Sequence, residues 1–150
     1  MTFVTEPLAA DVEVTGHPTL TLWLASSTTD ADIIARVDDV APDGTARYYN
    51  VEGKLRASLR KTATAPYNNL GLPWHPYTQA SAQPLTPQTP VKAELDLYAL
   101  SYLFKAGHRI RLTLNFSDER ATPRSDPAPR ITVYGGADKD SVLTLPVIPR

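Results

Sequence analysis

The sequence predicts an all-β domain, an antiparallel sandwich or jelly roll with long proline-rich loops and little helix. Short segments alternate apolar and polar side chains, which is typical of strands that bury one face. The chain has 14 prolines and 7 glycines, and so many prolines imply frequent turns and loops between short elements. No window keeps an apolar period of about 3.6 over roughly ten residues, so any helix is expected to be only a turn or two long.

The segment from Phe104 to Phe116 gives the clearest strand. Gly107 lies in a turn that leads into it, and the side chains that follow separate into two faces. The apolar face holds Ile110, Leu112, Leu114 and Phe116, and the polar face holds Arg109, Arg111, Thr113 and Asn115. This period of two predicts a half-buried strand.

The same alternation predicts strands elsewhere in the chain. It extends over residues 19–24, 32–38 and 91–97, and further candidates are 11–15, 46–51, 54–60, 131–134 and 142–147. A short helix is expected around 99–104. About eight short strands joined by turns favour an antiparallel sandwich or jelly roll. The predicted core consists of Leu20, Leu22, Leu24, Ile33, Val37, Leu95, Leu97, Ile110, Leu112 and Leu114.

Two segments, residues 61–90 and 117–130, are too rich in proline to be strands. Loops of this length are uncommon inside a compact domain, and they usually carry function or contact a neighbour. We therefore expect both loops to lie across a part of the protein that this chain does not contain.

Length and composition predict one domain covering residues 1–150. The formal net charge is −1, so the chain offers no long-range attraction for nucleic acid or an anionic membrane, and neither partner is expected. Cysteine is absent, and residues 1–20 lack the basic-then-apolar pattern of a signal peptide. Both features favour a cytoplasmic location, although the signal of an exported parent would lie upstream. A homo-oligomer stays open.

No catalytic residue and no cofactor is predicted. A nucleophile elbow requires the pattern G-x-S-x-G between a strand and a helix, and this pattern does not occur. His17 and His108 each follow a glycine near a strand end, where a structural hydrogen bond is the preferred interpretation. For His108 we expect that bond to go to the backbone.

The aspartates raise the question of a calcium site, because Asp30 and Asp32 lie two residues apart and further aspartates follow. The spacing lacks the glycine and the distal glutamate of a loop-type calcium site. We therefore expect turn formation and pairing with Arg36, Arg56 or Arg60, and predict no metal.

Aromatic side chains are the candidates for an interface or a pocket lining. Trp23 lies on the strand face opposite the leucines, and the adjacent Tyr48 and Tyr49 must point to opposite faces. Trp and Tyr often dominate binding at interfaces, and surrounding prolines reduce the entropy that a loop loses on docking. The candidate residues are Tyr67, Trp74, His75, Tyr77, Tyr48 and Trp23.

Several motifs, taken in order, carry a resemblance to a known family. They include Thr5-Glu6-Pro7-Leu8, Glu13-Val14-Thr15-Gly16-His17-Pro18, Gly53-Lys54-Leu55-Arg56, Pro73-Trp74-His75-Pro76 and Ala106-Gly107-His108-Arg109-Ile110-Arg111. The chain resembles the C-terminal domain of α/β serine hydrolases of the X-Pro dipeptidyl-peptidase and cocaine esterase type. The resemblance implies a jelly-roll β-sandwich, galactose-binding-domain-like, that packs against an α/β-hydrolase domain bearing a Ser-His-Asp triad.

The resemblance implies a function for the domain within its parent. It would brace the hydrolase domain of the same polypeptide and help to line its pocket, while the parent hydrolyses peptide, ester or amide bonds. The isolated chain is expected to be inactive. The alternatives are a free-standing carbohydrate-binding jelly roll, since similar domains bind sugars through loops at one end, and a purely structural or oligomerisation domain.

Overall fold

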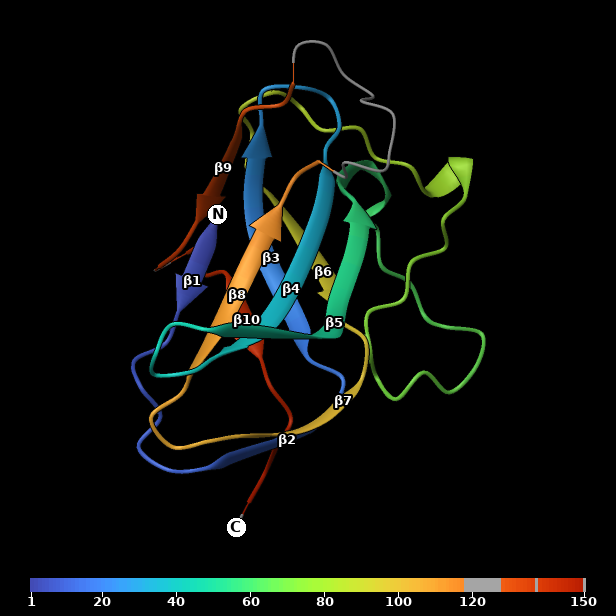
Figure 1. The fold of residues 1–150 in the computed structure, drawn as a ribbon. Helices are drawn as coiled ribbons and strands as arrows, with labels where there is room; N and C mark the ends of the chain where they lie inside the picture. The colour runs from blue at the N-terminus through green and yellow to red at the C-terminus, as the bar shows by residue number, and fades with distance from the viewer. Residues whose placement is uncertain (118–127, 137, 150) are drawn as a thin grey trace.

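The computed structural model describes residues 1–117, 128–136 and 138–149, apart from the side chain of Asn50. Strands dominate this part of the chain and form three antiparallel sheets (Figure 1). The first sheet has the order β1 (Thr2–Val4), β8 (Arg109–Asn115), β4 (Asp32–Val40) and β5 (Ala46–Arg56). The second has the order β10 (Val142–Thr144), β3 (Thr19–Ser26) and β6 (Val91–Asp96), with β9 (Ile131–Tyr134) also paired to β3. The third is β11 (Val147–Ile148), β2 (Val12–Gly16) and β7 (Leu100–Phe104).

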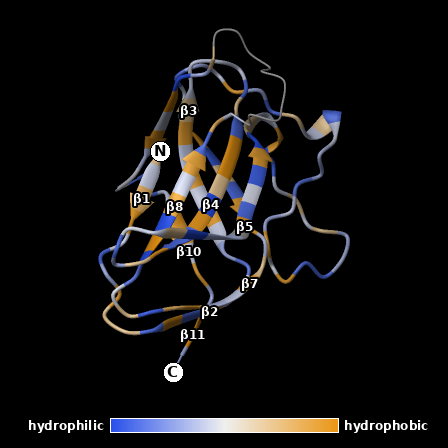
Figure 2. Cartoon of the chain, in the orientation of Figure 1, coloured by the Kyte–Doolittle hydropathy of each residue, from blue (hydrophilic) through white to orange (hydrophobic). Residues whose placement is uncertain are grey.

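The first two sheets bury their apolar faces in one core, as the predicted β-sandwich requires. Hydrophobic and hydrophilic residues alternate along β5 and β8 (Figure 2). In β3, Leu20, Leu22 and Leu24 are fully buried, and Leu20 pairs directly with Leu95 of β6. The predicted core residues are buried except Leu112, which is half-buried.

The helix expected around 99–104 is wrong, because these residues form β7. Their backbone pairs with β2, from Val12 opposite Phe104 to Gly16 opposite Leu100. β7 is only five residues long, so its side chains show no clear period of two. Pairing with a strand far away in the sequence therefore decides its structure.

Three strand boundaries also differ from the predictions. The expected strands 46–51 and 54–60 are one strand, β5, which ends at Arg56 and continues into the short 3-10 helix η1 (Ala57–Leu59). The expected strand 142–147 is divided into β10 and β11, with Pro146 between them. β1 was not predicted, since three residues are too few to show alternation.

The two long sides of the sandwich differ. On one side β5 meets β6 so closely that a Cβ on Gly53 would lie 2.4 Å from the carbonyl oxygen of Asp96. The amide of Tyr98 also donates to the carbonyl of Glu52 at 3.0 Å. On the other side, within the described part of the chain, no backbone hydrogen bond joins β1 to β9 or β10. One side of the sandwich is closed by backbone contacts, and the other is open between the sheets.

The long loop after η1 is fixed to the sandwich at several points. Gln83 donates a backbone hydrogen bond to Ser58 and Leu85 donates one to Thr29, both at 2.7 Å. Leu85 itself enters the core. The short 3-10 helix η2 (Gln79–Ser81) is capped by Thr78, whose side chain accepts a hydrogen bond from the Ser81 amide. Of the second expected loop, residues 118–127 lie outside the described residues.

Candidate docking site

His75 holds the proline-rich loop against the second sheet. Its imidazole is buried, with Nδ1 3.2 Å from the carbonyl oxygen of Lys61 and Nε2 2.9 Å from that of Glu94. Glu94 belongs to β6, which is the last strand of its sheet. The ring therefore contacts a carbonyl oxygen on the free edge of β6, and it covers part of an edge that would otherwise be exposed.

Beyond this anchor, residues 66–77 form an aromatic loop that projects from the body of the domain. The segment lies at the right of Figure 1, away from β1 and β9. Its apolar side chains face solvent: Tyr67 is 63% exposed, Leu70 75% and Tyr77 58%. Trp74 is half-buried. Large exposed apolar side chains gathered on one loop are typical of an interaction site.

The aromatic loop borders a shallow groove with a volume of about 520 Å³. The groove combines rings, amides and one carboxylate, that of Asp96. Partial burial, and then the negative charge of Asp96, raise the pKa of the Tyr77 hydroxyl. Its lining residues are Tyr67, Asn68, Asn69, Leu70, Leu72, Pro73, Trp74, His75, Tyr77 and Asp96.

Local hydrogen bonds hold the aromatic loop in one conformation. The amide of Ala63 donates to the carbonyl of Trp74 at 3.0 Å, and that of Leu72 donates to Asn69 at 3.1 Å. The amide of Leu70 donates to the side chain of Asn68, which supports the left-handed backbone of Leu70 at φ 60°. A loop ordered in this way loses little conformational entropy when a partner binds.

Four of the six candidate residues lie together in this loop, namely Tyr67, Trp74, His75 and Tyr77. His75 contributes mainly as an anchor, since both of its ring nitrogens face backbone carbonyls. The sequence did not single out Leu70 or Asp96. Leu70 gave no signal apart from its position among prolines, and Asp96 enters the groove only through tertiary folding.

The other two candidates lie elsewhere and do not line the groove. Tyr48 is exposed on the outer face of β5, where its ring centroid lies 5.0 Å from the guanidinium carbon of Arg36. Its hydroxyl donates to Glu52, and burial followed by this carboxylate raises its pKa. Trp23 is half-buried in β3, opposite Lys92 of β6 and Tyr134 of β9.

His108 forms a buried polar cluster with Asp39 instead of bonding to the backbone, as was expected. Its Nδ1 lies 2.8 Å from the Asp39 carboxylate, which is almost fully buried and also accepts from the Tyr102 hydroxyl at 2.7 Å. A buried carboxylate needs such donors, and the histidine supplies one that the sequence could not locate.

A contact between histidine Nδ1 and a carboxylate also occurs in serine-hydrolase triads, where a serine hydroxyl bonds to Nε2. Among the described residues, no serine or threonine hydroxyl is hydrogen-bonded to Nε2 of His108. The contact between His108 and Asp39 fixes the start of β8 to the end of β4.

Asp30 and Asp38 pair with arginines. Asp30 pairs with Arg56, as expected, and accepts from both the amide and the hydroxyl of Ser58. Asp38 is buried between Arg111, at 2.8 Å, and Arg36, at 3.1 Å. Within the described ranges, no three histidine, aspartate or glutamate side chains converge as metal ligands.

No helix in the described part of the chain is long and apolar enough to cross a membrane. The described residues form a β-sandwich that carries the aromatic loop and a buried histidine–aspartate pair.

Comparison with known proteins gives the family. The profile of the X-Pro dipeptidyl-peptidase C-terminal non-catalytic domain matches residues 1–145, and the chain belongs to this family. The protein Mb1866c of Mycobacterium bovis is 34% identical over 99% of this chain and 24% of its own length. Cocaine esterase of a Rhodococcus species is 31% identical over 77% of this chain and 17% of its own length.

Solved structures show the same fold. A CocE/NonD family hydrolase from Staphylococcus aureus superposes with a TM-score of 0.79 at 21% identity, over 99% of this chain and 30% of that one. An α-amino acid ester hydrolase gives 0.77 at 22% identity, over 99% of this chain and 25% of that one. The chain thus spans about a quarter of the length of these larger hydrolases. The domain is the non-catalytic C-terminal part of such proteins.

Proposed function

We propose that this domain braces the α/β-hydrolase domain of the same polypeptide, and that the aromatic loop at 66–77 is its docking contact. The observation that carries this proposal is the exposure of Tyr67, Leu70 and Tyr77 on a loop that local bonds already hold in place. When a partner covers apolar area of this kind, its removal from water stabilises the complex.

Trp74 is the expected anchor of the contact. Its ring borders the groove and is half-buried in the isolated domain, so docking can bury the remainder. A tryptophan near the centre of an interface typically contributes about 2 kcal/mol or more to binding. The surrounding tyrosines would exclude water from it.

The parent would be a serine hydrolase acting on ester, amide or X-Pro peptide bonds. The names of the relatives support this reaction class, since they include an X-Pro dipeptidyl-peptidase and a cocaine esterase. The nucleophile, its histidine and the oxyanion hole would all lie on the hydrolase domain. This domain would contribute rigidity and part of a pocket wall.

The docking proposal is tested in the parent polypeptide, cloned from the reading frame that contains this chain. That frame should encode a G-x-S-x-G hydrolase upstream of Met1, and an unrelated protein there contradicts the proposal. In the parent, Trp74→Ala should lower the melting temperature of the hydrolase domain. Tyr98→Ala is the matched control, because Tyr98 is also exposed, at 70%, but lies outside the groove. If both substitutions lowered the melting temperature equally, the proposed role of the loop in docking would be contradicted.

A carbohydrate-binding role is the second candidate, and one observation favours it. Tyr67 and Tyr77 lie beside the amide of Asn68 and the carboxylate of Asp96 in the same groove, and sugars commonly bind between rings and polar groups of this kind. A glycan array separates the two roles. Saturable binding that Tyr77→Ala abolishes supports the sugar site, and no binding leaves the docking loop as the better explanation.

A further inference from the structure

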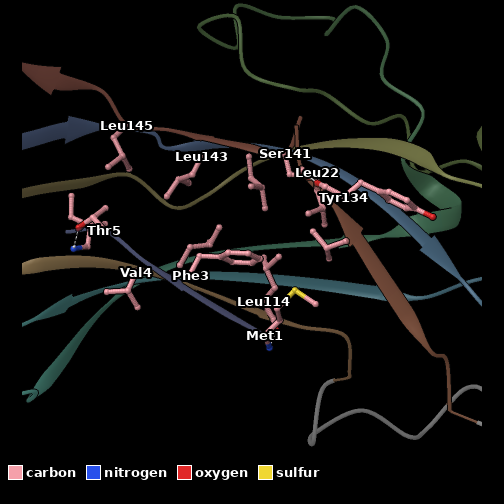
Figure 3. Close-up of a pocket in the computed structure, with 15 residues that line it drawn as sticks. Met1, Phe3, Val4, Thr5, Leu22, Leu114, Tyr134, Ser141, Leu143 and Leu145 are labelled. Atoms are coloured by element: carbon pink, nitrogen blue, oxygen red, sulfur yellow. Dashed lines mark hydrogen bonds between the residues drawn. The ribbon is translucent and has the colours of Figure 1, made fainter. Parts of the chain in front are cut away.

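The open side of the sandwich contains an apolar cleft, far from the aromatic loop. The cleft lies between β1 and β8 of the first sheet and β3, β9 and β10 of the second, and has a volume of about 480 Å³. Leu143 and Leu145 face Phe3 and Leu114 across it (Figure 3). We name this space the edge cleft.

Several apolar side chains around the edge cleft are incompletely buried. Phe3 is 47% exposed and Met1 54%. Leu112, Val133 and Leu143 are only partly buried, yet they pack against the core cluster. Protein interiors rarely leave a space of this size between packed layers.

Two hydroxyls at the rim are hydrogen-bonded within the protein. The hydroxyl of Ser141 donates to the carbonyl of Tyr134 at 2.6 Å and accepts from the amide of Trp23 at 3.0 Å. The Thr5 hydroxyl accepts from the amide of Ile110. Because these hydroxyls are committed to the protein, the cleft offers apolar contact rather than recognition of a polar ligand.

The free edge of β1 offers backbone hydrogen bonds instead. Met1 exchanges two hydrogen bonds with Leu114, at 2.8 and 2.9 Å, and the amide of Thr5 donates to Ile110. Alternation along an antiparallel strand then turns the N–H and C=O groups of Thr2 and Val4 away from β8. An exposed edge beside an apolar cleft is the arrangement that an added strand completes.

We propose that an extended apolar segment of the polypeptide preceding Met1 occupies the edge cleft and pairs with β1, completing the sandwich. Met1 lies at the cleft, and its nitrogen bonds to Leu114 as an internal amide would. The inference rests on the proposed place of the domain at the C-terminal end of a longer polypeptide. It does not depend on the aromatic loop, which lies on the other side of the molecule (Figure 1).

The test attaches to Met1 the 40 or so residues that precede the matching region of Mb1866c, the relative that is 34% identical. A second version carries the same residues in shuffled order. The authentic segment should slow amide hydrogen exchange at Thr2 and Val4 by at least about tenfold. It should also reduce the fluorescence of the apolar dye ANS by at least about half, because the dye binds exposed apolar surface.

Two results would overturn the inference. One is an equal response to the authentic and shuffled segments; the other is unchanged exchange at Thr2 and Val4. Saturable binding of decanoate that the authentic segment does not prevent would identify a small-molecule site instead. Phe3→Asp serves as the matched variant, because Phe3 is half-exposed in the isolated chain. The negative charge introduced at this position would be buried only when the segment covers the cleft. It should abolish the effect of the segment while leaving the isolated chain folded.

Discussion

Nδ1 of His108 donates a hydrogen bond to the buried carboxylate of Asp39 at 2.8 Å, which fixes the start of β8 to the end of β4. The same carboxylate accepts from Tyr102 of β7, whose hydroxyl lies 3.1 Å from that of Tyr49. Burial, and then the hydrogen bonds with Tyr49 and Asp39, raise the pKa of Tyr102. One carboxylate thus ties the third sheet to the first.

Replacing His108 should therefore destabilise the fold. His108→Ala removes a donor from a buried carboxylate, and we expect a loss of about 1–3 kcal/mol in the free energy of unfolding. Urea denaturation followed by circular dichroism measures the loss. His17→Ala is the control, because its ring is a third exposed and makes a longer contact, 3.2 Å, with the carbonyl of Leu97. A smaller loss for His108→Ala than for His17→Ala would contradict the structural role of the pair.

Asp30 should make the domain sensitive to acid. Burial acts to raise its pKa, but hydrogen bonds from Arg56, Ser58 and Ala31 outweigh burial and lower the pKa below its usual 3.8. The unfolded chain therefore binds a proton at a higher pH than the folded protein does. The stabilisation is present above about pH 4 and is lost as the pH falls through the folded pKa.

The measurement compares the pH dependence of unfolding in wild type and Asp30→Asn between about pH 6 and 2. The wild type should lose stability more steeply on acidification, and the two curves should converge at the acid end. Glu6→Gln removes the same charge from a side chain that is 95% exposed. Parallel curves for wild type and Asp30→Asn would show that the carboxylate contributes nothing through its pKa.

The two leucines of β8 should respond differently to truncation. Leu114 is 1% exposed, so Leu114→Ala should cost about 2–5 kcal/mol. Leu112 is half-buried and lines the edge cleft, so its truncation should cost less, about 1–2 kcal/mol. Chemical denaturation of both variants gives the comparison. A larger loss of stability for Leu112→Ala than for Leu114→Ala would contradict the position of Leu112 at the open side of the sandwich.

The isolated chain should not catalyse hydrolysis. The sequence contains no G-x-S-x-G nucleophile elbow, so X-Pro nitroanilides and nitrophenyl esters should turn over no faster than in buffer. A fluorophosphonate probe checks for a reactive serine by mass spectrometry. Turnover that the probe abolishes would require a nucleophile in this domain.

The sandwich was predictable because its central strands are long enough to show a period of two. Leu20, Leu22 and Leu24 mark β3 without ambiguity, and their burial follows from the pattern alone. β1 and β7 were not predicted. A strand of three residues, such as β1, has no measurable period. β7 is defined by its pairing with β2. Short elements depend on tertiary contacts, which local sequence does not encode.

Some features of the candidate site could also be predicted from the sequence, and others depend on the fold. Trp74 and Tyr77 could be named as candidates from composition, because aromatic residues among prolines stand out in sequence. The function of His75 as an anchor depends on the carbonyls of Lys61 and Glu94, which lie 14 and 19 residues away. The partner of His108 is 69 residues distant. Only folding reveals which carboxylate the histidine meets.

The most direct test of the central claim is hydrogen–deuterium exchange on the aromatic loop. Exchange in residues 66–77 is compared between the isolated domain and the same domain within its parent hydrolase, with the loop tip at Tyr98 as an internal reference. We expect protection of peptides that contain Leu70 and Trp74 in the parent, and none at Tyr98. Identical exchange of residues 66–77 in both states would contradict docking through this loop.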